Sequence, residues 1–403
     1  MRIAILGYGV EGKETLKFVK SKYPKAKVVI LDQKRDRNYL KSLDSFDIIF
    51  RTPGIPYKTK EIQKAIRKGV KVTSATDVFL TGARGTVVGV TGTKGKSTTT
   101  TLIYEILKKA KKDVYIAGNI GKSPLGLLPK LRRNSISVLE LSSFQLQGIS
   151  KSPSVAVILG VFPDHMDHHK NFSEYVNSKA GIVRFQSASD TVFYVPRDKI
   201  SSQIAKLSAG QKIPISPENF PVDLKILGQH NRQNAAMAAA VASYFGVSPV
   251  ISLGVITEFA GLPHRLKFVK NVDGVSFYND SASTNPQTTV AALKSFPGKT
   301  KILIAGGRDK NLDFEILRDT LKKQDVRAVI LFGECKTKIK NAVEGTVPIY
   351  GSNNLAGAVR SALKKATPGD VVIFSPGATS FDMFENYKKR GGAFDRVVKK
   401  LKR

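Results

Sequence analysis

The feature that most constrains the fold of this 403-residue chain is a glycine-rich loop at residues 89–98, which read GVTGTKGKST. The loop follows TVVGV, an apolar stretch typical of a buried strand, and it precedes a helical pattern. Glycines let backbone N–H groups close around phosphates, while Lys96 supplies a point charge and Ser97 a hydroxyl for Mg²⁺. The strict G-x-x-x-x-G-K-[ST] pattern fails at one position, because Val90 stands where its first glycine belongs. The order of strand, loop and helix still predicts a phosphate-binding loop in an α/β domain.

Strand and helix patterns alternate along the rest of the chain in three successive segments. Residues 1–82 contain four strand patterns, beginning with RIAILG and KVVILD, and the helix pattern EGKETLKFVKSKY. Residues 83–260 contain TVVGV, VYIAG, SVLELSS and VAVILG and the alanine-rich helix NAAMAAAVASYF. Residues 261–403 contain FYND, KILIAGG, AVILFG and VVIFSPG. We therefore expect an α/β protein of three tandem domains, with Rossmann-like N- and C-terminal domains and a central P-loop ATPase-like domain.

A second glycine loop lies near the start of the chain. Gly7, Gly9 and Gly12 form a G-x-G-x-x-G turn between a strand pattern and a helix pattern, and Asp32 ends the next strand pattern. This is the spacing of a dinucleotide-binding fingerprint, which by itself favours a nicotinamide-dependent oxidoreductase. The alternative is a tight turn that binds no ligand.

Acidic residues and histidines follow two strand patterns of the central segment. Glu140 ends the first of them, at a position where carboxylates of α/β sheets often hold a metal. After the second, FPDHMDHHK at residues 162–170 includes three of the chain's five histidines and two aspartates. The spacing alone is compatible with a zinc site or with a polar loop that binds no metal. The nearby phosphate loop favours a further Mg²⁺ site.

Composition excludes several classes of protein. The formal net charge of +33 attracts polyanions, but lysines are spread along the whole chain and no DNA- or RNA-reading motif accompanies them. We therefore favour a solvated basic surface over specific nucleic-acid binding. The single cysteine excludes an intrachain disulfide and a multi-cysteine zinc site. Because the first residues lack a signal-peptide pattern and no apolar stretch approaches about 20 residues, we expect a cytoplasmic protein without membrane insertion.

The central loop resembles the ATP loop of the Mur ligase and folylpolyglutamate synthetase superfamily, whose members activate a carboxylate as an acyl phosphate that an amine then attacks. The motifs LELSSFQL, DHMD, GQHNRQNAAMAAA, NDSASTN and SPGATSFDMF follow in the family's order over almost the whole chain. The match is closest to the D-glutamate-adding members. It implies ATP, Mg²⁺, D-glutamate and UDP-N-acetylmuramoyl-L-alanine as ligands of a monomer that serves peptidoglycan synthesis.

The resemblance also implies roles for residues that match the family's motifs. Nucleotide contacts are expected at Gly92, Thr93, Lys94, Gly95, Lys96, Ser97, Thr98, Asn231, Asn234, Arg265 and Asp280. Contacts to the UDP-linked substrate and to glutamate are expected at Gly9, Val10, Asp32, Gln33, Thr52, Pro53, Gly54, Ser142, Thr284, Lys310, Ser380 and Tyr387. Catalytic roles are expected for Lys96, Asn119, His165 and Lys179, and metal ligation for Ser97, Glu140, His165 and Lys179. Lys179 would be carbamylated; without the resemblance it is typical of a lysine on a helix surface.

Two positions depart from the family pattern. Residues 279–285 read NDSASTN, so that Ala282 stands where the D-glutamate enzymes usually have a lysine. Lys94 stands where the ATP loop usually has asparagine, and we hypothesise that it partly restores the missing positive charge. A sibling ligase that adds another amino acid such as L-glutamate, and a folate-polyglutamylating enzyme, are the alternative enzymes. The separate N-terminal glycine loop, together with RTPGIP at residues 51–56, argues against the folate enzyme.

Overall fold

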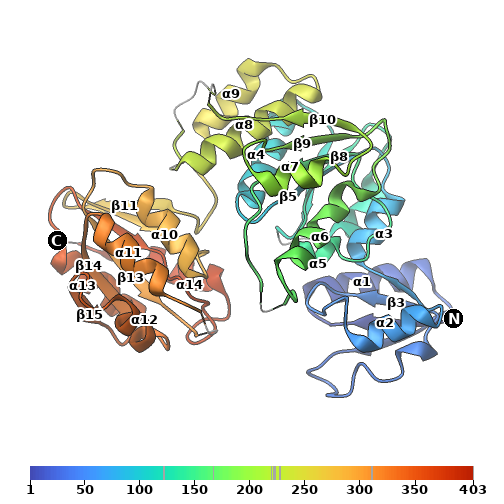
Figure 1. Ribbon diagram of the computed structural model, residues 1–403, viewed down its shortest axis with the longest axis horizontal. Helices are drawn as coiled ribbons and strands as arrows, with labels where there is room; N and C mark the ends of the chain where they lie inside the picture. Colours follow the sequence, from blue (N-terminus) through green and yellow to red (C-terminus); the bar gives the residue numbers. More distant parts are fainter. Residues whose placement is uncertain are drawn as a thin grey trace. The chain divides into compact units, whose positions relative to one another are not determined.

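The computed structural model describes residues 1–120, 123–166, 168–218, 220, 224–226, 228–309 and 312–402. The chain forms two compact units, one of residues 1–222 and 232–257 and the other of residues 223–231 and 258–403. The first unit contains two sheets and the second contains one, each accompanied by helices (Figure 1). The predicted α/β class is therefore confirmed, whereas the boundaries after residues 82 and 260 stay a prediction. No helix among the described residues is long and apolar enough to cross a membrane.

The first sheet has four parallel strands in the order β2-β1-β3-β4. Its strands are β1 (Arg2–Leu6), β2 (Lys27–Leu31), β3 (Ile48–Arg51) and β4 (Lys71–Thr73), and its helices are α1 (Val10–Lys22), η1 (Leu43–Ser45) and α2 (Lys60–Arg67). Helix α3 (Ala75–Gly82) follows β4, and its Phe79 and Leu80 pack in a core cluster of the second sheet. Strand β1 is apolar at four successive positions because both faces of a parallel sheet are covered by other elements. Since β1 lies in the interior of the sheet, its glycine loop reaches the carboxyl edge between the ends of β2 and β3.

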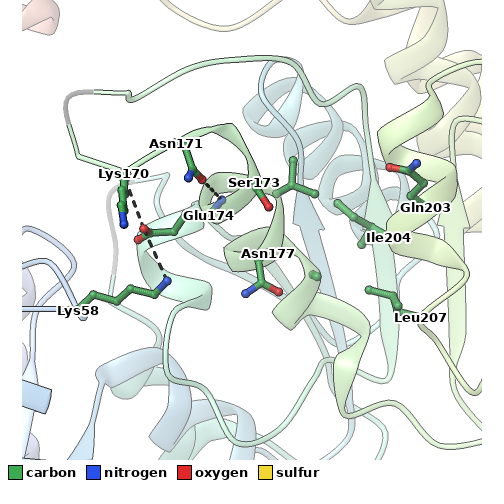
Figure 2. A pocket seen from close by; sticks show the side chains of 11 residues that line it. Lys58, Lys170, Asn171, Ser173, Glu174, Asn177, Gln203, Ile204 and Leu207 are labelled. Atoms are coloured by element: carbon green, nitrogen blue, oxygen red, sulfur yellow. Dashed lines mark hydrogen bonds and ion pairs between the residues drawn. The ribbon is translucent and has the colours of Figure 1, made fainter.

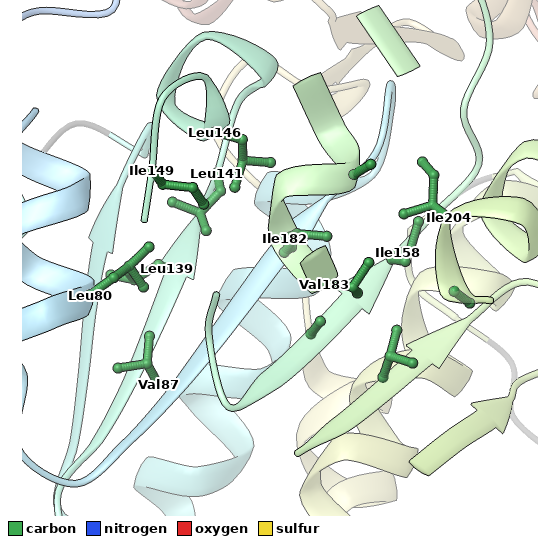
Figure 3. Packing of buried hydrophobic residues seen from close by; sticks show 14 of the residues in the cluster. Leu80, Val87, Leu139, Leu141, Leu146, Ile149, Ile158, Ile182, Val183 and Ile204 are labelled. Carbon is green, nitrogen blue, oxygen red and sulfur yellow. The ribbon is translucent and has the colours of Figure 1, made fainter. Parts of the chain in front are cut away.

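The second sheet has six parallel strands in the order β10-β9-β8-β5-β7-β6. Its strands are β5 (Thr86–Thr91), β6 (Val114–Gly118), β7 (Ile136–Glu140), β8 (Val155–Ile158), β9 (Thr191–Tyr194) and β10 (Gln211–Pro214). Its helices are α4 (Lys96–Lys109), η2 (Pro124–Lys130), α5 (Ser143–Leu146), α6 (Phe172–Arg184), α7 (Lys199–Ala205), α8 (Gln229–Tyr244) and α9 (Pro249–Glu258). One of its buried clusters packs Leu139 and Leu141 together with Ile158, Ile182 and Val183 (Figure 3).

The strand order of the second sheet explains why distant motifs meet. From β5 the chain builds β6 and β7 on one side and then β8, β9 and β10 on the other, so that β5 lies between β7 and β8. In open parallel sheets, ligands bind at the carboxyl ends of the strands where the order reverses in this way. The phosphate loop follows β5, Glu140 ends β7, and the histidine segment, residues 162–170, follows β8. All three therefore lie at this edge of the sheet.

The third sheet has six strands in the order β11-β12-β16-β13-β14-β15. Its strands are β11 (Lys267–Val272), β12 (Val275–Asn279), β13 (Lys301–Gly306), β14 (Val326–Phe332), β15 (Ile349–Gly351) and β16 (Val371–Phe374). Its helices are α10 (Pro286–Lys294), α11 (Glu315–Lys323), α12 (Lys336–Val343), α13 (Leu355–Lys365) and α14 (Tyr387–Lys400). Strand β11 is antiparallel to β12 and was not expected from the sequence, because its lysines and partly exposed positions obscure the apolar pattern of a strand.

A buried pair of opposite charges lies between α1 and β3. Arg51 is 2% exposed, and Oε1 of Glu11 is buried without a hydrogen-bond partner among the described residues. Burial raises the pKa of Glu11 from 4.5 to about 7, and attraction to Arg51 and a hydrogen bond with Gln145 offset only part of this effect. Burial lowers the pKa of Arg51 to about 10, so the guanidinium keeps its charge at neutral pH.

The raised pKa of Glu11 predicts a pH-dependent stability. Because the folded pKa is the higher one, the contribution of this carboxyl is full below pH 4.5 and is lost as the pH rises to about 7. The loss amounts to at most about 3 kcal/mol of unfolding free energy. Glu11→Gln should remove this slope and raise the urea midpoint above neutral pH. Glu14→Gln, which breaks an exposed pair with Lys17 on the same helix, should leave the slope unchanged. An identical slope in wild type and Glu11→Gln would contradict the assignment.

Candidate active site

The phosphate loop connects β5 to α4, as the sequence predicted. Gly95 precedes α4 with a φ of 85° and lies against the buried side chain of Asn234, so a side chain at residue 95 would collide with the amide. Nζ of Lys96 donates to the carbonyls of Gly92 at 3.0 Å and Thr93 at 3.1 Å. The first-turn N–H groups of α4 and this ammonium provide positive charge for an anion. Ser97 and Thr98 lie in the same first turn, and both are partly exposed.

Lys179 is buried, contrary to the interpretation that its sequence context alone would give. The residue is 1% exposed, and its Nζ donates to the carbonyl of Gly92 at 2.8 Å. Its ammonium also lies 4.5 Å from the centre of the Tyr175 ring. Burial, followed by repulsion from Lys96, holds the pKa of Lys179 well below its usual range. Burial and the charge of Lys96 both favour the uncharged amine over the ammonium.

Glu140 carries a buried oxygen that no described residue satisfies. The residue is 2% exposed at the end of β7, and Oε1 accepts a hydrogen bond from Nδ2 of Asn119 at 2.8 Å. Oε2 is buried and has no hydrogen-bond partner among the described residues. Buried carboxylate oxygens are normally hydrogen-bonded or bound to a metal, so this atom fits a hard cation such as Mg²⁺. Ser142 follows two residues later and caps α5 through a hydrogen bond from the Gln145 backbone N–H at 3.3 Å.

The histidine segment is attached to the phosphate loop. Thr93 donates its hydroxyl to the carbonyl of Phe162 at 2.9 Å and accepts a hydrogen bond from the Phe162 N–H at 3.0 Å. Nζ of Lys94 lies 3.7 Å from the carboxylate of Asp164. His165 has a positive φ of 57° and a side chain that is 48% exposed.

The zinc alternative has no support in the part of the chain that the structure describes. No cluster of three or more histidine, cysteine, aspartate or glutamate side chains there could hold a metal ion. His169 is buried, and its Nε2 lies 3.0 Å from Oγ of Ser143. Asp167 lies outside the described residues.

The N-terminal glycine loop is held by Asp32, which the sequence singled out. Its carboxylate accepts hydrogen bonds from the backbone N–H groups of Lys34 at 2.9 Å and Tyr8 at 2.6 Å, and these bonds lower its pKa. The guanidinium of Arg35 lies 5.0 Å from the centre of the Tyr8 ring. The predicted UDP contacts Gly9, Val10, Asp32, Gln33, Thr52, Pro53 and Gly54 therefore lie on the loops that follow β1, β2 and β3.

The second unit brings together the loops that follow β12, β13 and β16. Asp280 is 8% exposed and accepts hydrogen bonds from the Ser283 hydroxyl at 2.5 Å, the Ser375 hydroxyl at 2.8 Å and the Leu266 N–H at 3.1 Å. Burial raises the pKa of Asp280 to about 6 despite these bonds. The charge of nearby Arg265 lowers the pKa of the same carboxyl.

Arg390 is a further buried cation of this unit, which the sequence analysis missed. It is 0% exposed, and its guanidinium donates to the Ser281 carbonyl at 2.8 Å, the Ser281 hydroxyl at 3.1 Å and the Ala378 carbonyl at 2.9 Å. Arg390 thus joins the loop that carries Thr284 to the loop that carries Ser380, and its own helix begins at Tyr387. A basic residue before two glycines in a lysine-rich helix gives no sequence signal of burial. Lys310, the predicted glutamate contact, lies outside the described residues, and Asn231 and Asn234 both lie on α8.

A surface pocket lies beside α6 and α7 rather than at the phosphate loop. Figure 2 shows Glu174 next to Lys58 and Lys170, with Asn177, Ile204 and Leu207 on the remaining walls. The carboxylate of Glu174 is 3.6 Å from Nζ of Lys58 and accepts a hydrogen bond from the Lys170 backbone N–H. The charges of Glu174 and Lys58 therefore offset each other within the pocket. None of the predicted site residues lines it.

The Lys94–Asp164 contact allows a direct test of the compensation hypothesis. Both side chains are partly exposed, so the pair adds at most about 1 kcal/mol to stability. Because Lys94 lies in the phosphate loop, Lys94→Ala should raise the KM for ATP about 3- to 10-fold with little change in the melting temperature. Steady-state kinetics with varied ATP would measure this effect. The matched control is Lys17→Ala, which breaks a surface pair on α1. Equal losses in the two variants would contradict the hypothesis.

Comparisons with known proteins give consistent results. Residues 90–217 match the model of the Mur ligase middle domain, and residues 264–377 match that of the Mur ligase glutamate ligase domain. The UDP-N-acetylmuramoylalanine--D-glutamate ligase of Acetivibrio thermocellus is 36% identical over 90% of this chain and 84% of its own length. The enzyme of the same name from Clostridium botulinum is 32% identical over 99% of this chain and 97% of its own length.

Solved structures support the same fold. The UDP-N-acetylmuramate-alanine ligase MurC of Thermotoga maritima superposes with a TM-score of 0.60 at 18% identity, covering 99% of both chains. The MurF ligase of Thermotoga maritima, solved in complex with ADP, gives a TM-score of 0.62 at 18% identity, covering 99% of this chain and 95% of its own.

Proposed function

The chain belongs to the Mur ligase family, and on that premise we propose that it joins D-glutamate to UDP-N-acetylmuramoyl-L-alanine in an ATP-dependent reaction of peptidoglycan synthesis. ATP phosphorylates the L-alanine carboxylate of the substrate, and the carboxylate becomes an acyl phosphate while ADP leaves. The glutamate amine then attacks the acyl carbon, and the C–O bond to phosphate breaks. The products are an amide and inorganic phosphate, with one proton released from the amine.

The observation that carries this proposal is that two lysines share one carbonyl acceptor. Nζ of Lys96 and Nζ of Lys179 donate to the same Gly92 oxygen, at 3.0 Å and 2.8 Å. This arrangement supports a site where one lysine binds phosphate and the other is held in a low-pKa state beside it. A structural lysine would gain nothing from a buried position next to a second ammonium, because like charges repel strongly where water is excluded.

Different residues of the first unit have different roles in phosphoryl transfer. Lys96 and the N–H groups at the start of α4 stabilise the negative charge of the transferred phosphate. Glu140, His165, Ser97 and a carbamylated Lys179 are the groups that would hold Mg²⁺. Bound there, Mg²⁺ would neutralise charge on the phosphate oxygens. Asn119 holds Oε1 of Glu140 and so orients the carboxylate.

Carbamylation of Lys179 agrees with its environment. Only an uncharged amine attacks carbon dioxide, and the lowered pKa favours that form at neutral pH. The attack forms an N–C bond and releases a proton, which leaves a carbamate with one negative charge. The carbamate is an anion that can reach a metal. Its negative charge is attracted to the ammonium of Lys96, whereas a protonated Lys179 would be repelled by it.

The second unit supplies the glutamate contacts in this proposal. Thr284, Ser380 and Lys310 would bind the carboxylates of glutamate, while Asp280 and Arg265 belong to the nucleotide contacts. Arg390 keeps the loops that carry Thr284 and Ser380 in place. The proposal further includes a monomer that works in the cytoplasm, where ATP and UDP-linked precursors are available.

Phosphate release from ATP in the presence of UDP-N-acetylmuramoyl-L-alanine tests the proposal. Parallel reactions contain D-glutamate, L-glutamate or no amino acid, and mass spectrometry identifies the product. We expect release stimulated by D-glutamate and a product heavier by one glutamate residue. Stimulation by L-glutamate alone would keep the mechanism and assign Ala282 to a change of amino-acid specificity. No stimulation by either amino acid would contradict the proposed function.

A further inference from the structure

Arg51 is a buried cation that two functional loops of the first unit share. It ends β3 and is 2% exposed. Nη1 donates to the carbonyls of Ile55 at 2.7 Å and Thr52 at 3.4 Å. Nη2 donates to the carbonyls of Phe144 at 2.8 Å and Gln147 at 3.1 Å. All four acceptors are backbone oxygens, so the contact depends on the planar fork of the guanidinium, which lysine does not have.

The first of these loops is the TPGIP turn, residues 52–56, which contains the predicted UDP contacts Thr52, Pro53 and Gly54. The hydroxyl of Thr52 donates to the carbonyl of Leu6 at 2.8 Å, directly before the N-terminal glycine loop. A side chain at Gly7 would collide with Thr52, so the turn packs closely on that loop. A ligand that orders this turn therefore also orders the carbonyls of Thr52 and Ile55, to which Arg51 donates.

The second contact is with α5 and the residue that follows it. The ring of Phe144 lies 5.1 Å from His165, 5.4 Å from His168 and 5.2 Å from His169, measured between ring centres. Oγ of Ser143 on the same helix lies 3.0 Å from Nε2 of His169. The position of this short helix therefore sets the position of the histidine segment. Arg51 holds the helix by carbonyls that its four-residue length leaves without internal partners.

Two further contacts near Arg51 also connect the N-terminal part of the chain with α5 and the residues that follow it. The guanidinium lies 5.6 Å from the centre of the Tyr57 ring, and this ring packs against Gly148, whose φ is 75°. Glu11 opposes the charge of Arg51 and is hydrogen-bonded to Gln145 of α5. Buried charges usually add little net stability compared with an apolar contact of the same volume. Added stability therefore does not explain these buried charges well. A better explanation is that they hold the two loops in one defined arrangement.

We propose that Arg51 is a positioning residue that couples binding of the UDP-linked substrate to the placement of α5 and the histidine segment. The inference rests on the proposed function, because that function supplies the UDP-linked substrate for which the TPGIP turn contains predicted contacts. Binding at the turn fixes the carbonyls of Thr52 and Ile55, and Arg51 transmits this order to Phe144 and Gln147. Productive placement of the histidine segment then depends on the presence of the substrate.

Hydrogen exchange measures this coupling without ATP or Mg²⁺. In the wild type, UDP-N-acetylmuramoyl-L-alanine alone should slow exchange in residues 2–12 and 52–57 and also in residues 142–150. In Arg51→Lys, which keeps the charge but not the fork, the first two segments should keep this effect. Residues 142–150 should lose it. Arg67→Lys on the exposed face of α2 is the matched control and should behave as the wild type.

Kinetics separate positioning from folding. Arg51→Lys should lower kcat about 10- to 100-fold, with the KM for ATP within about twofold of the wild type. The double variant Arg51→Met with Glu11→Gln removes both charges but leaves four carbonyls without their donor, so its melting temperature should fall. The protein that is folded at the assay temperature should show the same loss of kcat, and a melting temperature well above the assay temperature would exclude a shortage of folded protein.

The outcomes separate the two proposals. If the substrate slowed exchange of residues 142–150 in Arg51→Lys as much as in the wild type, the coupling would be overturned. An unchanged kcat in both Arg51 variants would overturn it as well. In that case the proposed function would stand, because the wild type binds the substrate. If the substrate slowed no exchange in the wild type, the result would instead contradict the proposal that the chain binds the UDP-linked substrate. The coupling, which depends on that binding, would then be contradicted as well.

Discussion

Glu140→Gln should lower kcat at least about 1,000-fold while leaving the melting temperature close to that of the wild type. Glutamine has the size of glutamate and keeps an oxygen for the 2.8 Å hydrogen bond from Asn119, so packing at the end of β7 is preserved. The substitution replaces Oε2, the buried atom without a partner among the described residues, by a neutral N–H₂ group. That group cannot ligate a cation, and it leaves positive charge near the phosphates unbalanced.

Two measurements test this assignment. Phosphate release at increasing Mg²⁺ should show that Glu140→Gln needs far more cation than the wild type, and Mn²⁺ binding followed by electron paramagnetic resonance should weaken in parallel. Glu218→Gln, an exposed carboxylate paired with Arg197, serves as the control and should change neither readout. A variant that keeps kcat within about threefold and binds Mn²⁺ normally would remove Glu140 from the metal site.

The sequence indicated the parts of the site whose pattern has a direct physical meaning. The phosphate loop was predictable because glycines, a lysine and a hydroxyl between a strand and a helix have few other uses. Glu140 and the histidine segment were predicted to follow two strands, and the strand order then brings those strand ends to the two sides of β5. The prediction therefore depended on a rule about parallel sheets, not on any contact that the sequence displays.

Buried cations were the part that the sequence could not reveal. Arg51 and Arg390 each bind backbone carbonyls, and such acceptors are present at every residue and leave no mark in the sequence. Lys179 lies on a helix with a polar pattern, and only the fold places its Nζ at the Gly92 carbonyl. Strand β11 was missed for the related reason that an edge strand with lysines lacks a continuous apolar run.

Lys179→Met should lower kcat at least about 1,000-fold and abolish the uptake of carbon dioxide. Methionine fills the buried space of the lysine stem but has no amine, so neither a carbamate nor the 2.8 Å bond to Gly92 can form. In wild type, ¹³C-labelled bicarbonate should give a carbamate carbonyl resonance, which Lys179→Met lacks. Lys109→Met on the exposed face of α4 is the control and should keep both the resonance and the activity.

The smaller variant Lys179→Ala distinguishes a carbamate from a lysine that acts as a cation. Alanine leaves a cavity beside Gly92 in which a short carboxylate such as formate or acetate can take the place of the carbamate. If the modified lysine supplies negative charge, these anions should restore part of the lost kcat, whereas methylammonium should not. Restoration by methylammonium alone, with no carbamate resonance in wild type, would mean that Lys179 works as an ammonium. The low pKa that burial and Lys96 impose favours the first outcome, because a buried second ammonium beside Lys96 is the costly state.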